Sequence, residues 1–118
     1  MQVTIPWPPK ELSPNSRCHW RVKARVGKDY KRTVFYLCRE ANLSVEGNEK
    51  VHLALHFYPP DNRRRDLDNC VSSLKLGLDA LAEALKINDE RFVIHPALFI
   101  RTGGEVVVKI CDSGGNCG

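Results

Sequence analysis

The chain has no long hydrophobic run. Its longest apolar stretches are four or five residues, whereas a helix that spans a bilayer needs about 20 apolar residues. Residues 1–5 lead directly into prolines, so they lack the basic and then apolar pattern of a secretory signal. We therefore expect no membrane association and a cytoplasmic location.

The cysteines lack the spacing of a metal site or of a disulfide framework. Their number is odd, they are widely spaced, and no two form a Cys-x-x-Cys pair. This pattern argues against structural zinc and against the cross-linked scaffolds of secreted domains. The last two flank a glycine-rich tail and are able to pair on oxidation, but free thiols are the expectation. The five are Cys18, Cys38, Cys70, Cys111 and Cys117.

A strong charge of either sign is also lacking, since the net charge is +4. Such a mild excess says little about partners, but its distribution is informative. Basic residues crowd an N-terminal segment in which Trp20 and Tyr30 are interleaved, and three arginines form a second cluster. Solvated surface would explain both clusters as well as a phosphate-binding surface would. The residues expected to contact DNA are Arg17, Arg21, Lys23, Arg25, Arg63, Arg64 and Arg65.

The length of 118 residues and the apolar content of 42% fit a single domain, residues 1–118. Hydrophobic periodicity predicts strands at 2–5, 51–58, 92–101 and 105–111, and helices at 28–41 and 68–86. The order of these elements predicts an α/β (α+β) fold, a small mixed β-sheet with two main helices packed on it.

Other parts of the chain complete this expectation. Residues 6–27 are expected to form a long connection, of the kind that is more often functional than idle. Pro96 indicates an edge strand or a bulge. The glycine-rich residues 112–118 are expected to form a flexible tail. The core-facing residues expected in the second helix are Val71, Leu74, Leu78, Leu81 and Leu85.

The segment after the second arginine cluster is the most suggestive of chemistry. In an extended segment, Asp66 and Asp68 would point to the same side while Leu67 faces the core. Converging carboxylates repel each other unless a cation lies between them, and magnesium takes such oxygen ligands together with substrate phosphate. Structural alternatives are that Asp68 or Asn69 caps the following helix and that Asp66 pairs with an arginine. A glycosyltransferase would need a much larger domain.

Two further residues are candidates for the same site. Asp89 lies in the polar turn Asn88-Asp89-Glu90, where a turn residue is the simpler explanation. Lys75 lies two helical turns after Asp68 on the same face of the expected helix. It would either pair with Asp79 at a four-residue step or supply a cation near the metal, where it would offset charge that develops on a phosphate.

In sequence order, these motifs make the chain similar to the RusA family of endodeoxyribonucleases, the Holliday-junction resolvases common in phages and prophages. The resemblance covers nearly the whole chain, and its specificity comes from the motifs taken together. The segments that carry it are Ile5-Pro6-Trp7-Pro8-Pro9, Asn15, His19-Trp20-Arg21, residues 64–69, residues 75–81, Asn88-Asp89 and two terminal strands.

The resemblance implies a homodimeric, magnesium-dependent nuclease that resolves four-way DNA junctions in recombination and repair, with Mn²⁺ able to substitute for Mg²⁺. Asp66, Asp68 and Asp89 match the family's metal-site aspartates, and Lys75 matches its essential lysine. The chain departs from the family in having more residues between Asn69 and this lysine. Without a gap Ser72 would take the lysine's place, but Lys75 keeps the Lys-x-x-x-Asp-Ala-Leu pattern that follows.

Two rival functions stay open at this point. One is a non-catalytic module that binds branched DNA, and the presence of all three aspartates argues against it. The other is a magnesium-dependent nuclease that acts on flaps or on RNA. Comparing cleavage of different substrates would separate them.

Overall fold

The computed structural model describes residues 1–111. These residues form a four-stranded mixed sheet with three α-helices, which confirms the predicted fold class. The expected tail at 112–118 and the possible pairing of Cys111 with Cys117 fall outside the described residues. The strands are β1 (Gln2–Pro6), β2 (Val51–Tyr58), β3 (Phe92–Leu98) and β4 (Glu105–Cys111). The helices are α1 (Trp20–Glu40), α2 (Leu67–Ser73) and α3 (Lys75–Leu85), with 3₁₀ turns η1 (Lys10–Leu12) and η2 (Asp89–Arg91).

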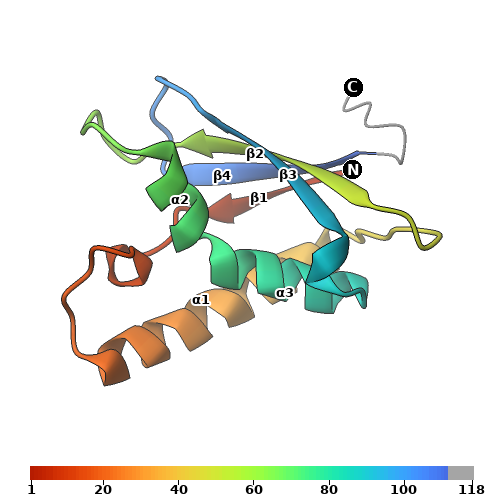
Figure 1. Ribbon diagram of the computed structural model, residues 1–118, viewed down its shortest axis with the longest axis horizontal. Helices are drawn as coiled ribbons and strands as arrows, with labels where there is room; N and C mark the ends of the chain where they lie inside the picture. The colour runs from red at the N-terminus through yellow and green to blue at the C-terminus, as the bar shows by residue number, and fades with distance from the viewer. Residues whose placement is uncertain (112–118) are drawn as a thin grey trace.

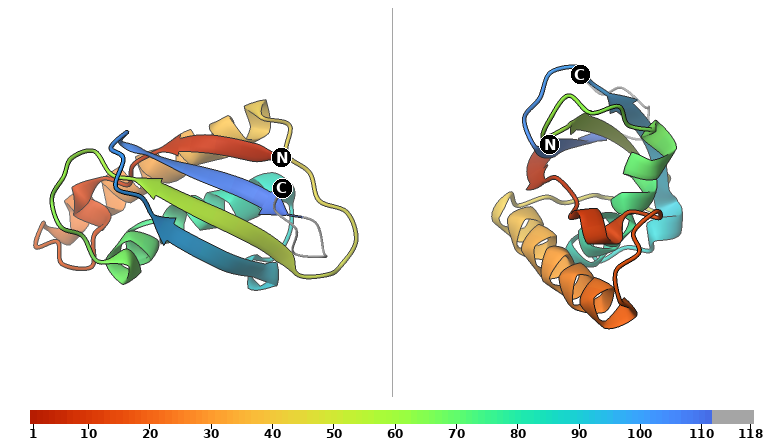
Figure 2. Two further views of the ribbon diagram at one scale, coloured as in Figure 1. Left: turned by 90° about the horizontal axis from the view of Figure 1, so that it is seen from above. Right: turned by 90° about the vertical axis from the view of Figure 1, so that its left-hand side faces the viewer.

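The sheet has the order β1-β4-β2-β3, in which β3 runs parallel to β2 and the other pairs are antiparallel. Helices α1 and α3 lie side by side against one face of the sheet (Figures 1 and 2). The alternation in β2 explains this, because Val51, Leu53, Leu55 and Phe57 are buried toward the helices. The predicted strand at 51–58 is confirmed.

Helix α1 begins at Trp20 and not at Lys28 as the sequence suggested. His19 caps it, its Nδ1 accepting a hydrogen bond from the Arg21 backbone at 3.1 Å. Gly27 lies buried inside the helix, and a Cβ built there would be 2.6 Å from Cδ1 of Leu76 on α3. The expectation that Gly27 belongs to a connection was therefore wrong, since this glycine allows two helices to approach each other.

The second predicted helix is divided into α2 and α3 at Leu74, where the backbone departs from regular helix at φ −88° and ψ −3°. Its hydrophobic stripe is otherwise as expected. Leu74, Leu81 and Leu85 are buried, and Val71 and Leu78 are half-buried against the same core. After Leu85 the chain leaves the helix through Lys86 in a left-handed conformation, with φ +58°.

Strand β3 lies at the edge of the sheet, as Pro96 indicated. It ends at Leu98, three residues before the predicted end at 101. The backbone N–H of Phe99 donates to Phe57 of β2 at 3.0 Å. Because residues two apart on a strand face the same way, Pro96 directs its missing N–H away from β2 and costs the sheet no hydrogen bond.

Cys18, Cys38 and Cys70 are free thiols, as expected. Burial raises the pKa of Cys38 to about 11 and also raises the pKa of Cys70. Both thiols therefore stay neutral at physiological pH. Within residues 1–111, no helix combines the length and the apolar character needed to cross a membrane.

Candidate active site

Three connecting segments meet at one end of the sheet (Figure 1). They are residues 7–9 after β1, residues 59–66 after β2, and residues 99–104 between β3 and β4. Backbone hydrogen bonds hold them together: Trp7 N–H donates to Gly104 at 3.1 Å, and Gly103 N–H donates to Pro59 at 2.9 Å. Because β4 is antiparallel to β1 and β2, its start lies beside the ends of both strands, and these distant segments meet at one end of the sheet.

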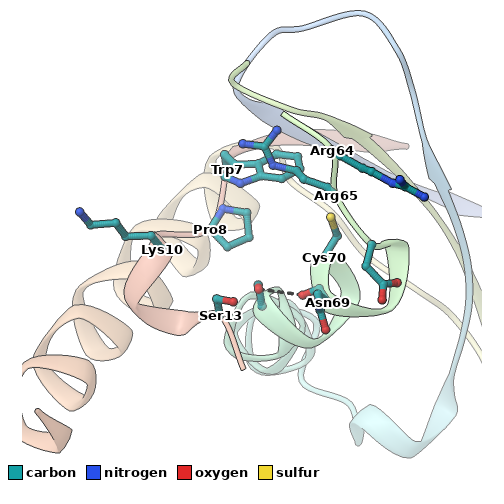
Figure 3. Close-up of a pocket in the computed structure, with 10 residues that line it drawn as sticks. Trp7, Pro8, Lys10, Ser13, Arg64, Arg65, Asn69 and Cys70 are labelled. Atoms are coloured by element: carbon teal, nitrogen blue, oxygen red, sulfur yellow. Dashed lines mark hydrogen bonds between the residues drawn. The ribbon is translucent and has the colours of Figure 1, made fainter. Parts of the chain in front are cut away.

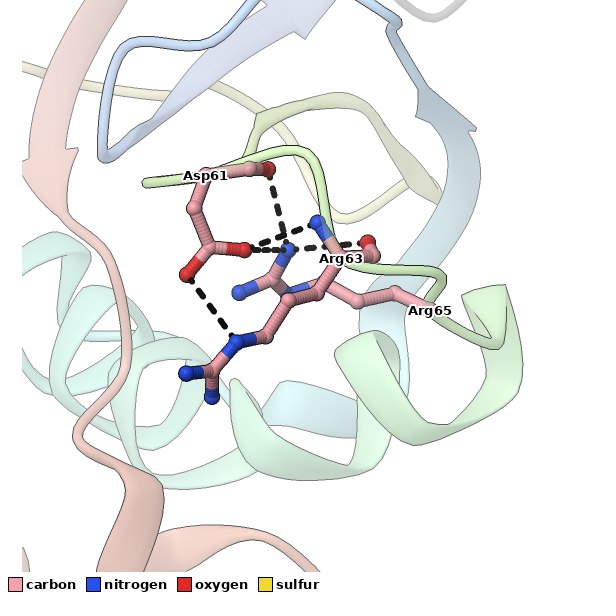
Figure 4. Close-up of polar contacts among 3 residues, drawn as sticks. All are labelled: Asp61, Arg63 and Arg65. Carbon is pink, nitrogen blue, oxygen red and sulfur yellow. Dashed lines mark hydrogen bonds and ion pairs between the residues drawn. The ribbon is translucent and has the colours of Figure 1, made fainter.

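Residues 61–65, which we call the arginine segment, are folded around the side chain of Asp61 (Figure 4). Arg65 donates from one guanidinium nitrogen to the carboxylate of Asp61 at 2.9 Å and to the backbone carbonyls of Asp61 and Arg63 at 3.1 Å. The backbone N–H of Arg63 donates to the same carboxylate at 2.9 Å. The Arg65 side chain and the Arg63 backbone N–H hold the pKa of Asp61 below its usual value.

The three arginines therefore differ in what they are free to do. Arg65 is mostly buried and also lies over the Trp7 ring, with 5.3 Å between Cζ and the ring centroid. These contacts stabilise the conformation of the connection at residues 59–66. Arg63 is 86% exposed and makes only a long ion pair with Asp61, at 3.8 Å. Arg64 is exposed and makes no hydrogen bond or ion pair within residues 1–111. Arg63 and Arg64 thus carry the available positive charge.

Asp66 and Asp68 lie at the start of α2. Asp66 is the N-cap: its Oδ1 accepts a hydrogen bond from the backbone N–H of Asp68 at 3.0 Å. The segment is therefore not extended through Asp68, in contrast to the prediction. The structural alternative in which Asp68 or Asn69 caps the helix is also wrong. Leu67 does pack against the core between the two acidic residues. Both aspartates are exposed, and no hydrogen bond or ion pair within residues 1–111 engages the Asp68 carboxylate.

A shallow hollow beside Asp66 is bordered by cationic side chains (Figure 3). Trp7 comes from the segment after β1 and Lys10 begins η1, while Arg64 and Arg65 come from the arginine segment. Asp66 and Asn69 lie at its α2 side. Sequence reasoning missed Lys10, although it directly follows the two prolines that turn the chain away from β1. Basic residues and the Asp66 carboxylate therefore border the same hollow.

Asp89 lies apart from the other two aspartates in the protomer. It begins η2, just before β3, and Phe92 at the start of β3 is paired with Val51 at the start of β2. Asp66 instead follows the far end of β2, so the two sites lie at opposite ends of the parallel pair (Figure 2). Asp89 borders a separate hollow with Lys31 and Glu83. Within residues 1–111, no three His, Cys, Asp or Glu side chains form a group able to hold a metal ion.

Lys75 is the first residue of α3 and is exposed. The alternative role proposed for it, an ion pair with Asp79, is absent from the described part of the chain. Ser72, the other candidate for its position, is exposed on α2. Both therefore reach solvent near the division between the two helices.

The basic N-terminal segment lies on and before α1. Arg17 precedes the helix, and Arg21, Lys23 and Arg25 are exposed on it without ion pairs among the described residues. Trp20 is 68% exposed, stacks on His19 and lies beneath the Arg21 guanidinium.

Tyr30, in contrast to Trp20, is buried and donates its hydroxyl to the Pro6 carbonyl at 2.7 Å. Burial raises its pKa. Of the two aromatic residues noted in this segment, only Trp20 is therefore available to a partner.

Comparison with known proteins gives relatives over nearly the whole chain. An uncharacterized protein of Xylella fastidiosa is 38% identical over 115 residues, which cover 92% of this chain and 74% of that protein. The two belong to one family. The crossover junction endodeoxyribonuclease RusA of Escherichia coli K12 is 29% identical over 123 aligned positions, covering 95% of this chain and 94% of RusA. The enzyme of the same name from Enterobacteria phage 82 is 28% identical at the same coverage. No protein-family model matches the chain.

Proposed function

We propose that this protein is a magnesium-dependent endodeoxyribonuclease of the RusA group that resolves four-way DNA junctions. One observation carries the proposal: the exposed Asp66 carboxylate borders a hollow lined in part by basic residues, and the exposed Asp68 follows two residues later, in a chain similar to RusA along almost its full length. The name of these relatives specifies crossover junctions as their substrate. The same similarity supports a role in recombination and repair inside the cell.

The donor set fits magnesium. Asp66 and Asp68 offer hard oxygen ligands, and the Asp68 carboxylate is not engaged by another described residue. Magnesium usually binds through one or two carboxylates and completes its coordination with water and substrate phosphate. When bound, it would polarise the scissile phosphate and lower the pKa of a coordinated water. Manganese, which also favours oxygen ligands, is proposed to substitute.

The other candidate residues act on the DNA in this proposal. Lys75 offsets the negative charge that develops on the phosphate as the bond to the 3′ oxygen breaks. Arg63, Arg64 and the basic residues of the N-terminal segment bind the phosphate backbone. Arg65 contributes mainly by fixing the loop, since one of its guanidinium nitrogens already binds the Asp61 carboxylate and two backbone carbonyls.

The position of Asp89 supports the proposal of a homodimer. If Asp89 binds the same metal ion as Asp66 and Asp68, the three side chains must come together. Within one protomer they do not, because Asp89 lies at the opposite end of the β2–β3 pair. A second copy related by a two-fold axis would resolve this, because such an interface brings different ends of the two copies together reciprocally. A four-way junction has near-two-fold symmetry, so a two-fold dimer would present one site to each of two opposed strands.

Cleavage of a panel of labelled substrates tests the proposal. With magnesium, the wild-type protein should nick a four-way junction in preference to a flap, a duplex and an RNA of the same sequence. Chelation of the metal should abolish nicking. Asp68→Asn, which keeps the shape of the side chain, should reduce the nicking rate about a hundredfold or more while it still binds the junction. Tight binding without product under any divalent metal would instead indicate a DNA-binding module.

A further inference from the structure

An apolar surface lies beside the arginine segment. Phe99 is 37% exposed and Ile100 is 96% exposed, directly after the end of β3. They share a second hollow with Leu98 and with residues of the arginine segment. Single exposed apolar residues are common on protein surfaces, but here consecutive apolar residues adjoin arginines that have charge available.

The apolar surface continues as a stack of rings. Phe99 stacks on Tyr58 with ring centroids 4.9 Å apart, and His56 meets Phe99 edge-on at 5.0 Å. The Arg101 guanidinium lies over the Tyr58 ring, with 4.4 Å between Cζ and the ring centroid. These residues lie on the sheet face opposite α1 and α3, since their neighbours Leu55 and Phe57 are buried toward the helices.

Backbone hydrogen bonds fix this surface in place. Phe99 N–H donates to Phe57 at 3.0 Å, and the N–H groups of Gly103 and Gly104 both donate to Pro59, at 2.9 and 3.2 Å. The residues that carry the exposed side chains are therefore tied to the central strand at both ends of the connection. A surface ordered in advance loses less conformational entropy when it binds a partner.

The arginine segment separates this surface from the candidate active site. Arg64 and Arg65 border both hollows, with Asp66 on one side and Phe99 and Ile100 on the other. A DNA backbone that follows the exposed arginines, with a phosphate near Asp66, would carry its neighbouring bases toward the apolar side. Positive charge beside aromatic and apolar side chains is the combination that recognises single-stranded DNA.

We propose that Tyr58, Leu98, Phe99 and Ile100 form a base-stacking surface that receives unpaired DNA bases next to the cleaved phosphate. This inference rests on the proposed function and adds how the enzyme distinguishes a branch point from a duplex. Bases at a crossover can unstack at small cost, whereas bases within a duplex cannot. In this arrangement Ile100 makes apolar contact with the unpaired base beside the stacked rings of Phe99 and Tyr58.

The test compares Ile100→Ser with Tyr36→Ser, a matched control that removes another exposed side chain, 61% exposed on α1. Calcium replaces magnesium so that binding is measured without cleavage. We expect Ile100→Ser to weaken binding to a junction about tenfold and to leave duplex binding unchanged, with Tyr36→Ser equal to wild type. When a junction carries 2-aminopurine at the crossover, its fluorescence should change less on binding Ile100→Ser than on binding the wild-type protein. Phe99→Ala is a second variant, and thermal unfolding shows whether it is folded.

The inference would be overturned if Ile100→Ser and Phe99→Ala both bound the junction as tightly as the wild-type protein. Loss of the dimer in sedimentation by Ile100→Ser would also overturn it, because the surface would then be covered by a second copy. In both cases wild-type nicking of the junction would still stand. If the wild-type protein nicks no substrate in the panel, the proposed function itself fails, and the two failures are thus distinguishable.

Discussion

Neighbouring arginines at positions 63 to 65 have different surroundings although their side chains are identical. Arg65 is held by Asp61, two backbone carbonyls and the Trp7 ring, whereas Arg64 has no polar partner in the described chain. The sequence predicts a basic cluster near the aspartates but not this division, because it depends on how the loop turns back on itself. The same holds for Asp66, whose role as helix cap depends on where α2 begins.

The different surroundings of Arg64 and Arg65 give a prediction for their alanine variants. Arg64→Ala should weaken binding to junction and duplex alike and reduce the slope of log Kd against log salt by about 1, since one phosphate contact is lost. Its melting temperature should match that of the wild type. Arg65→Ala should lower the melting temperature, because it removes the side-chain donor to the Asp61 carboxylate and to two backbone carbonyls. Salt titrations and thermal unfolding measure both effects, and equal behaviour of the two variants would contradict the assignment.

Asp61 makes the loop sensitive to acid. Its pKa is lowered in the folded protein, first by the Arg65 side chain and then by the Arg63 backbone N–H. A lowered pKa contributes stability above the unfolded-state value of about 3.9, and this stability is lost as the pH falls through the folded-state value. The contribution is small because the carboxylate is exposed to solvent.

The matching experiment compares wild type with Asp61→Asn by thermal unfolding between about pH 6 and pH 3. The wild type should be the more stable protein at the upper end, and the difference should shrink toward zero at the lower end. A difference that is constant over this range would mean that the carboxylate charge does not contribute.

Elements with a simple hydrophobic pattern were predictable, and those decided by contacts between elements were not. The alternation of β2 gave its limits correctly, and Pro96 marked the edge position of β3. The start of α1 was missed because Gly27 reads locally as a helix breaker, while its buried place against α3 is a tertiary effect. The division at Leu74 has no glycine or proline to signal it.

The close approach at Gly27 gives a prediction at this scale. Gly27→Ala gains about 1 kcal/mol of helix propensity, but its Cβ would meet Leu76 Cδ1 at 2.6 Å. Overpacking of this kind costs about 1–3 kcal/mol, so we expect a net loss of stability in denaturant unfolding. In a Leu76→Ala background the clash is removed, and the same Gly27→Ala change should then stabilise the protein. Destabilisation in both backgrounds would show that Leu76 is not the cause.

Across the whole molecule, the sheet brings together residues that are far apart in sequence and separates others that the motifs associate. Trp7, Arg64 and Phe99 meet at one end, although no local pattern connects them. Asp89 is carried to the other end because β3 runs parallel to β2. The sequence motifs associate the three aspartates in one proposed metal site, but they do not predict that one protomer keeps Asp89 apart from the other two. That outcome depends on strand direction, which periodicity does not specify.

The proposal that Asp66 and Asp68 act with Asp89 of the partner subunit is tested most directly by mixing two inactive variants. Asp66→Asn and Asp89→Asn should each fail to nick a four-way junction. When they are co-folded in equal amounts, half of the dimers combine one copy of each. Every such dimer has one site with all three aspartates, so nicking should return to about a quarter of the wild-type level. No recovery in a mixture shown to contain mixed dimers, or full activity of Asp89→Asn alone, would contradict this arrangement.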